Sequence, residues 1–398
     1  MSAVRTRCAP RLAVLLLAGL AAAAAACATP EPAVVRPPAE PQLASFGHDQ
    51  GLGNILAIQP YLEAGDYATT WDLGVKLEDY LRAAQGNGWL GPQTVVVFPE
   101  SIGSYLFAVD EAPELYRVRT QDDALDWLVN KNLWDFASRY PFVADRDRRW
   151  HWLFNHKAPR MARAYQGIFS RLARNFHVTI VAGSIVLPDP LVDNGALLLG
   201  SGRKLHHVSL VYDPEGKVMG APVREIYLST ARQPFIERGT TDELGVYATP
   251  AGKLGVLVGA DSFYPRCYEL LRDQKAEIVV AVSALPRRAT WDRKWPGYDG
   301  FPAPNEFARD DAGAITEREA RLKYGLPGLL RFTPAKIGVD VYLHGQLWDV
   351  GYDGQTLVVM DQAVESGPLV DGPALTNVWL SGVTPTPTLA PLAPSSAL

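Results

Sequence analysis

The pattern of apolar and polar positions along the chain predicts an α/β protein. Several apolar, β-branched runs have the length and composition of strands buried on both faces of a sheet; they cover residues 54–62, 94–101, 176–188, 252–261 and 276–285. Between the first two runs, residues 70–88 carry apolar side chains at helical spacing and end at Gly-Asn-Gly, which stops a helix. This order of strand, helix and strand predicts a βαβ unit.

Turn sequences divide the later apolar runs. Residues 204–228 are predicted to form strands broken at Asp-Pro-Glu-Gly, whose Pro and Gly favour a hairpin turn. Residues 337–361 repeat this pattern, and "YDGQT" at 352–356 predicts a second hairpin. Residues 111–165 form a mainly helical, Trp-rich insert, and aromatic side chains at such spacing indicate packing rather than a ligand site. Together these elements predict sheets with helices on their outer faces.

The N-terminal residues have the pattern of an export signal. Arg5, Arg7 and Arg11 precede an apolar run that is too short for a membrane span. Cys27 closes this run among small residues and resembles the lipidated Cys of bacterial lipoproteins, with cleavage after an Ala-x-Ala site as the alternative. We therefore expect four parts: a signal at 1–27, a Pro-rich linker at 28–44, a folded domain at 45–382 and a Pro-rich, disordered tail at 383–398.

Charge and cysteine content narrow the classes of partner. A net charge of -5 gives no reason to expect a nucleic acid. Of the three cysteines, Cys8 leaves with the signal and Cys27 carries the lipid, so Cys267 stands alone and no intramolecular disulfide is expected. The expected location is the bacterial cell envelope, periplasm or exterior, with membrane contact only through a lipid anchor at Cys27.

Seven segments, taken in order, resemble the carbon–nitrogen hydrolase (nitrilase) superfamily. They are "ILAIQ" at 55–59, "VVVFPES" at 95–101, "VAGSIV" at 181–186, "YDPEGKVMG" at 212–220, "GKLGVLVGADSFYPRCYELL" at 252–271, "AEIVV" at 276–280 and "YDGQT" at 352–356. The resemblance implies an α/β fold, a four-layer αββα sandwich, often dimerised through the helices beside the nucleophile turn. It also implies a site in which a Glu is the general base, a Cys attacks an amide or nitrile carbon and a Lys stabilises the developing charge. No metal or organic cofactor is implied.

Glu100 stands at the position of the family's general base. It follows a buried apolar strand, so its carboxylate is partly desolvated, which suits proton transfer. Without the family context, a Glu that only hydrogen-bonds the following loop would be the simpler interpretation. With that context, the catalytic interpretation is favoured.

The Lys position is altered in this chain. Counting from Gly216 of the first hairpin places Arg224 there, whereas counting back from Leu228 places Glu225 there. Neighbouring residues of a strand face opposite ways, so only one of the two can point into the site. Arg224 could hold an oxyanion or carboxylate, whereas Glu225 would set a second carboxylate near Glu100 and repel an oxyanion.

The Cys position is also altered, because the anchors on both sides place Gly259 at the nucleophile. A glycine has no side chain, so covalent catalysis by the family route cannot occur there. Asp261 and Ser262 follow in the same turn and are predicted to line the substrate pocket. Ser262 has no His or Lys beside it in sequence to take its proton.

Other substitutes for the nucleophile are weak. Cys267 lies about two helical turns further on, roughly 12 Å along the axis, and is expected to be a small buried apolar residue. His206 and His207 point to opposite faces of one strand, so at most one reaches a pocket. The sequence contains no motif of a different hydrolase or metal site.

Two functional hypotheses follow, and a third is weaker. The first is a degenerate family member that binds a small amide-, nitrile- or acyl-like ligand, or a partner, without turnover. The second is an active hydrolase of carbon–nitrogen bonds in which Glu100 activates water beside Gly259, or another nucleophile acts. The third is a structural envelope lipoprotein that docks through the Trp-rich insert at 111–165.

Overall fold

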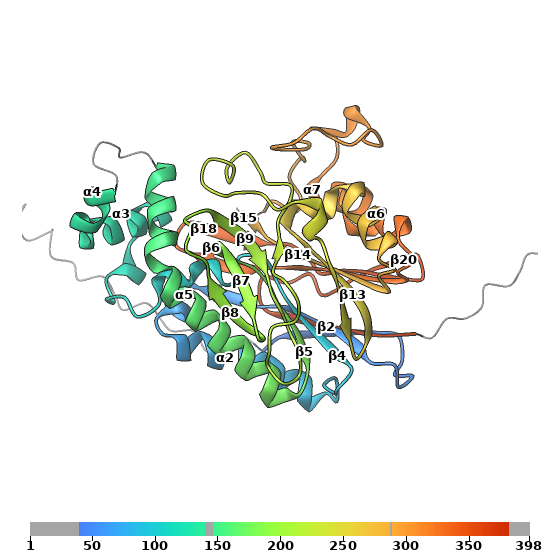
Figure 1. Cartoon of the computed structure of the whole chain (residues 1–398). Coiled ribbons are helices and arrows are strands. Elements are labelled where there is room, and N and C mark those ends of the chain that lie inside the picture. The colour runs from blue at the N-terminus through green and yellow to red at the C-terminus, as the bar shows by residue number, and fades with distance from the viewer. Residues whose placement is uncertain (1–39, 140–145, 287–288, 382–398) are drawn as a thin grey trace, which may run out of the picture. The chain divides into compact units, whose positions relative to one another are not determined.

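The computed structural model describes residues 40–139, 146–286 and 289–381 (Figure 1). The predicted export signal, Cys27 and the predicted tail at 383–398 lie outside the described residues. The linker was predicted to end at residue 44, but strand β1 already begins at Gln42 and runs to Phe46. It pairs in parallel with β21 (Ala374–Trp379), so residues 42–44 belong to the folded part.

Two six-stranded sheets form the centre of the folded part. The first has the order β1-β21-β2-β4-β5-β10 and the second the order β12-β13-β14-β16-β19-β20. Strands β2 and β4 are parallel neighbours joined through helix α2, which confirms the predicted βαβ unit. The strands not yet bounded are β2 (Asn54–Gln59), β4 (Thr94–Phe98), β5 (Thr179–Ala182), β10 (Val211–Tyr212), β12 (Val246–Thr249), β13 (Gly252–Val258), β14 (Ile278–Ser283), β16 (Ile337–Tyr342), β19 (Leu357–Met360) and β20 (Ala363–Ser366).

Helices cover the outer face of each sheet, as Figure 1 shows for α2 (Thr70–Gly86) and α5 (Arg146–Phe176) on one side and α6 (Pro265–Asp273) and α7 (Glu317–Tyr324) on the other. Between the sheets, side chains such as Val97 and Val258 pack in one core. On the outer face of the second sheet, a Cβ placed at Gly255 would touch Leu271 of α6. The predicted four-layer αββα sandwich is therefore confirmed.

Smaller sheets and short helices complete the fold. They comprise a three-stranded sheet of β11 (Val223–Arg224), β9 (Leu205–Ser209) and β6 (Ile185–Pro188), a hairpin of β7 (Pro190–Asp193) and β8 (Ala196–Leu199), and a sheet of β15 (Leu285–Pro286), β18 (Val350–Asp353), β17 (His344–Leu347) and β3 (Tyr61–Glu63). The remaining helices are α3 (Gln121–Lys131), α4 (Leu133–Arg139), α8 (Leu326–Leu329) and 3-10 turns that include η2 (Ala64–Tyr67), η3 (Ser104–Ala108) and η6 (Gly259–Phe263).

The second predicted hairpin, at 352–356, is wrong. The strands on its two sides belong to different sheets, because β18 pairs with β17 and β15 whereas β19 pairs with β16. The tight turn instead joins β17 to β18, where Leu347 and Val350 are partners across the ladder. Gly354 lets the chain cross between sheets, since its φ of 141° is open to glycine.

The last part of the Trp-rich region at 111–165 belongs to α5, a helix of the sandwich. Helix α5 runs without interruption through residue 165 and packs on the first sheet. Trp150 and Trp152 are buried in its core, which agrees with the packing interpretation, whereas Trp134 on α4 is 89% exposed. None of the described helices combines the length and the hydropathy that crossing a membrane requires.

Candidate active site

Glu100 lies just beyond the carboxyl end of β4, and its side chain is almost completely buried. The next residue, Ser101, has a φ of 66°, in the left-handed region, and its N–H donates to Ser184 Oγ at 2.6 Å. The glycine before Ser184 lies so close to the chain that an added Cβ would be 2.1 Å from the Pro99 carbonyl oxygen. The chain segments directly after β4 and β5 therefore lie in close contact, which fixes the Glu100 carboxylate at the edge of the first sheet.

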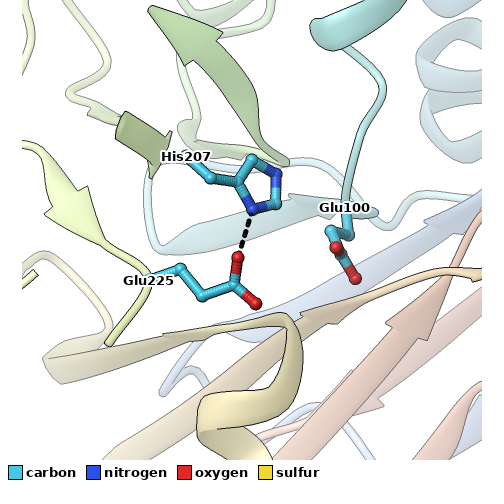
Figure 2. Close-up of side chains that lie close together, drawn as sticks. All are labelled: Glu100, His207 and Glu225. Atoms are coloured by element: carbon cyan, nitrogen blue, oxygen red, sulfur yellow. Dashed lines mark hydrogen bonds and ion pairs between the residues drawn. The ribbon is translucent and has the colours of Figure 1, made fainter. Parts of the chain in front are cut away.

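Glu225, not Arg224, faces the site. Arg224 Nη1 donates to Glu243 at 2.6 Å at the protein surface, and the two side chains are 24% and 36% exposed. Glu225 is 1% exposed and points toward Glu100 (Figure 2). Of the two residues between which the sequence left the choice open, Glu225 is the one that faces the site, and Arg224 points away from it.

Gly259 begins the turn η6 directly after β13. Its φ of 56° lies in the left-handed region, where a side chain is strained. A Cβ at this position would be 2.6 Å from Glu225 Oε1 and 3.3 Å from Glu100 Oε1. The three positions of the family site thus come together here, but the Glu225 carboxylate occupies the space that a side chain at 259 would need.

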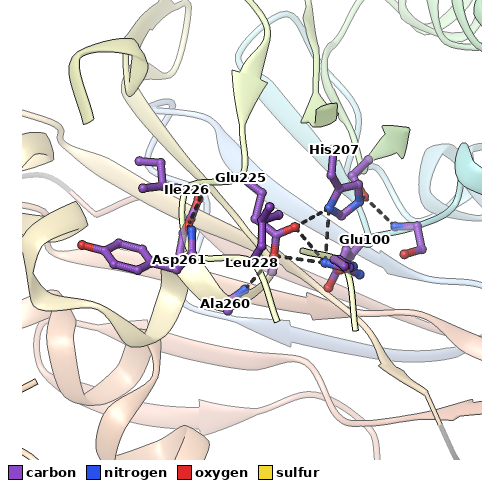
Figure 3. A network of polar contacts seen from close by, with 12 residues as sticks. Glu100, His207, Glu225, Ile226, Leu228, Ala260 and Asp261 are labelled. Atoms are coloured by element: carbon purple, nitrogen blue, oxygen red, sulfur yellow. Dashed lines mark hydrogen bonds and ion pairs between the residues drawn. The ribbon is translucent and has the colours of Figure 1, made fainter. Parts of the chain in front are cut away.

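Arg232 is the residue of this site that sequence reasoning missed. Its Nη2 donates to Glu100 Oε1, and its Nη1 donates to both oxygens of Glu225 at 3.0 and 2.8 Å. Figure 3 shows Glu100, His207 and Glu225 within the network of polar contacts at this site. Burial alone would lower the pKa of Arg232, but the two carboxylates raise it, so the guanidinium stays charged. For Glu225 the directions are opposite. Burial alone would raise the pKa of its carboxyl group, but Arg232 and His207 outweigh burial and lower that pKa.

A relay of hydrogen bonds holds Glu225 from the other side. His207 Nδ1 lies 2.7 Å from Glu225 Oε2, and His207 Nε2 lies 2.6 Å from Ser184 Oγ. Because the Glu225 carboxylate can only accept, His207 Nδ1–H donates to it, and in the neutral ring Nε2 then accepts from Ser184 Oγ. The order Ser–His–Glu is that of a hydrolase triad, but Ser184 is fully buried, so the relay orients Glu225 rather than attacking a substrate.

A cavity of about 690 Å³ opens above these groups. Glu100, Glu225, Arg232 and Gly259 form one part of its wall. Another part carries Arg321, whose Nε donates to Glu317 at 2.9 Å and whose Nη1 lies 3.1 Å from Tyr342 Oη. The rest of the wall includes four aromatic residues, Phe263, Tyr264, Trp295 and Tyr298, among small, polar and charged ones.

The structure places the two predicted pocket residues behind the turn, outside the cavity wall. Asp261 is buried and accepts the N–H groups of Ile226 and Tyr227 at 3.0 and 2.8 Å. Ser262 Oγ donates to the Gly259 carbonyl oxygen at 2.9 Å. Asp261 therefore ties the turn to the segment that follows β11, and Ser262 stabilises the turn internally.

The other residues considered as substitutes also lie outside the lining of this cavity, and His207 reaches the site only through its contact with Glu225. Cys267 is a buried free thiol on α6, and burial raises its pKa well above the ordinary value, which keeps it protonated. His206, on the opposite face of β9, lies 3.5 Å from Asp189. This agrees with the expectation that only one of the two histidines reaches the site.

Glu100, His207 and Glu225 also offer ligand atoms within 4.8 Å of one another, the kind of set that holds a divalent metal. Two features oppose such a use. The Arg232 guanidinium already supplies a positive charge to both carboxylates, and His207 Nδ1 is engaged by Glu225. A metal would have to displace both interactions, so the set fits an Arg-centred cluster better than a metal centre.

One sequence signal could have pointed to Arg232. With Glu225 in place of the Lys that the resemblance implies, two buried carboxylates lie side by side. Such a pair requires a cation close by. The segment that follows β11 offers Arg232 seven residues later, within a loop that turns back over the site. Nothing in the local pattern fixes the path of that loop, so only the structure shows the contact.

Comparisons with known proteins agree with this architecture. The model of the carbon-nitrogen hydrolase family matches residues 64–298, while a comparison with curated proteins gave no match. Among solved structures, a Cys-to-Ser mutant of an amidase from Nesterenkonia, described as from the nitrilase superfamily, aligns with a TM-score of 0.52 at 14% identity over 83% of this chain and 92% of that one. A double mutant of the Nesterenkonia amidase in complex with acrylamide gives 0.51 at 14% over 84% and 93%. The family model spans more than half of the sequence, and the chain belongs to the carbon–nitrogen hydrolase family.

Proposed function

We propose that this protein is a catalytically impaired member of the family that binds a small ligand in its cavity without cleaving a carbon–nitrogen bond. The observation that carries the proposal is the Glu100–Arg232–Glu225 cluster, which fills the catalytic position. It supports loss of turnover in two independent ways, through the missing nucleophile and through the reversed charge at the Lys position.

The missing nucleophile removes the covalent route. Gly259 offers no attacking atom, and the Ser262 hydroxyl is committed to a backbone carbonyl. Removing a covalent nucleophile typically costs several orders of magnitude in kcat. A rescue by Cys267 would require a thiolate, which its burial opposes.

The reversed charge opposes the developing oxyanion. Attack on an amide carbon places negative charge on its oxygen, and the family pattern meets that charge with a Lys. Here the Glu225 carboxylate stands beside Gly259, and the guanidinium of Arg232 is shared between two carboxylates. A tetrahedral intermediate would therefore meet more negative than positive charge.

An active hydrolase with Glu100 as base toward water is the second candidate. It is favoured by the cavity, which is open beside Glu100 and Gly259. In this mechanism Arg232 would have to bind the charged intermediate, because Arg224 points away from the site. Since Arg232 would first have to leave one of its two carboxylates, we favour the impaired form.

The proposal includes export to the cell envelope, with attachment through a lipid on Cys27, and it rests on the N-terminal sequence pattern. Association as a homodimer through the helices beside the η6 turn is part of the same proposal and rests on the family alone.

The experiment is an amidase assay on a panel of amides and nitriles. We expect no turnover by the wild type and measurable turnover when the family residues are restored by Gly259→Cys and Glu225→Lys in an Arg232→Gln background. The matched control carries Arg224→Lys in place of Glu225→Lys and should stay inactive, because residue 224 faces the surface. Turnover by the wild type that Glu100→Gln abolishes would contradict the proposal.

A further inference from the structure

The deepest part of the cavity carries more negative than positive charge. The side chains of Glu100 and Glu225 are only 4% and 1% exposed, and the two carboxylates share the single guanidinium of Arg232. Charges that are so far withdrawn from water are weakly screened. This part of the wall therefore attracts a cation and repels an anion.

One carboxylate oxygen in this wall is available to a ligand. Arg232 donates to Glu100 Oε1, whereas Glu100 Oε2 accepts no hydrogen bond from the residues that the structure describes. Glu100 lines the cavity. This oxygen is not among the fully buried atoms, so a donor on a bound ligand can reach it from the cavity and form a charge-assisted hydrogen bond.

The aromatic part of the wall suits the same kind of ligand. Phe263, Tyr264, Trp295 and Tyr298 line the cavity together with Glu100. Aromatic rings attract cations through their π faces. The wall already shows this preference, because the Arg321 guanidinium lies 5.1 Å from the centre of the Phe263 ring.

The remaining charged groups that line the cavity within the described residues do not reverse this preference. Arg321 is paired with Glu317, so that pair adds no net charge. Arg293, Lys294 and Asp299 are exposed, and water and salt screen their effect.

We propose that the cavity binds a small organic cation, namely a primary ammonium compound with an aromatic or apolar body. Its ammonium group donates to Glu100 Oε2, and its body packs against Trp295 and Tyr298. This inference rests on the proposed function, since it names the ligand class of a site that binds without turnover. The proposed ligand differs from the amide and nitrile ligands of the family because it carries a positive charge.

Three probes of one shape separate charge from shape: benzylamine, benzamide and benzoate, titrated calorimetrically into the full-length protein at pH 7. We expect benzylamine to bind at least tenfold more tightly than either of the others, because only it carries a positive charge. Equal or tighter binding of benzamide, or no binding of benzylamine, would overturn the inference.

Two variants locate the binding site. Glu100→Gln keeps the shape of the side chain and removes its charge, so we expect benzylamine binding to weaken by about tenfold to 100-fold, the usual effect of one charge-assisted hydrogen bond. Tyr298→Leu should weaken it by about threefold to tenfold through the lost ring. The matched control is Glu269→Gln on the outer face of α6, which pairs with Arg266 and should leave binding unchanged. Unchanged affinity in Glu100→Gln, with a melting temperature like that of the wild type, would also overturn the inference.

The outcomes separate this inference from the proposed function. If benzamide binds without being hydrolysed and benzylamine does not bind, the inference fails while the proposed function stands. If the wild type hydrolyses benzamide in a reaction that depends on Glu100, the proposed function itself fails.

Discussion

Three side chains decide what the former catalytic position can do. Glu100 and Glu225 would repel each other as a buried pair, and the Arg232 guanidinium between them turns this repulsion into a bridged cluster. Arg232 bridges the two carboxylates through one oxygen of Glu100 and both oxygens of Glu225. In the function that we propose, this cluster keeps Glu100 in the cavity wall without a role as general base.

Replacing Arg232 should therefore be costly. We expect Arg232→Met to lower the free energy of unfolding by about 3 kcal/mol, because it removes the guanidinium that both buried carboxylates share and leaves Glu225 only its contact with His207. Part of this loss should return at low pH, where the carboxylates are protonated. Urea denaturation at pH 7 and pH 4.5 checks both effects. Arg224→Met is the control, since its partly exposed pair with Glu243 should be worth less than about 1 kcal/mol. Equal effects of the two substitutions would contradict the role given to Arg232.

A second buried acid near the cavity makes stability depend on pH. Burial raises the pKa of Asp340 to about 6, although Arg321 acts against it. The unfolded value is about 3.9, so the folded state binds the proton more tightly and stability falls as pH rises from about 4 to about 6. The free energy of unfolding is expected to fall by roughly 3 kcal/mol, because the pKa of Asp340 is raised by about two units on folding. Urea denaturation across this range should show a flatter profile for Asp340→Asn than for the wild type. If stability depends on pH as steeply in Asp340→Asn as in the wild type, Asp340 is not the group responsible. The control is Asp273→Asn, which changes an exposed carboxylate on α6.

At the scale of elements, the apolar patterns predicted the position of a strand correctly wherever the strand is buried on both faces. Strands β2, β4, β13 and β14 and helices α2 and α6 lie where the sequence predicts them, because their side chains have one compatible environment. The hairpin at 352–356 was wrongly predicted because a Gly-containing turn looks the same whether the chain returns to its partner or crosses to another sheet. Strand β11 spans only Val223–Arg224, too short for periodicity to tell which neighbour faces inward.

The site was predictable only in part for the same reason. Glu100 and Gly259 follow long buried strands, so motif order located them. Arg232 lies in a loop without periodicity, and Asp261 looked like a pocket residue although it faces the backbone of the segment after β11. Long-range contacts of loops depend on packing that the local sequence does not encode.

The turn η6 and the end of β11 form one unit through Asp261. Asp261→Ala leaves the N–H groups of Ile226 and Tyr227 without an acceptor, and we expect a loss of about 2–4 kcal/mol in the free energy of unfolding. Asp261→Asn keeps an acceptor oxygen and should lose clearly less. Thermal and urea denaturation of the two variants measure the difference. If both variants lose the same stability, the hydrogen bonds to the backbone are not what holds this unit together.

For the whole molecule, the αββα sandwich preserves the frame of a carbon–nitrogen hydrolase around altered chemistry. The carboxyl ends of β4 and β13 still bring Glu100 and residue 259 together, with a cavity of about 690 Å³ above them. The function that we propose, binding in this cavity without turnover, uses the retained fold and cavity and needs neither a nucleophile at 259 nor a cation at 225.

The most direct test of this account is the rate at which the purified wild type hydrolyses amides and nitriles, measured beside Glu100→Gln with sensitive detection of released ammonia. We predict that neither protein exceeds the uncatalysed rate, because Gly259 offers no nucleophile and Glu225 opposes the oxyanion. Hydrolysis by the wild type that disappears in Glu100→Gln would contradict the account and show that Glu100 activates water at this site.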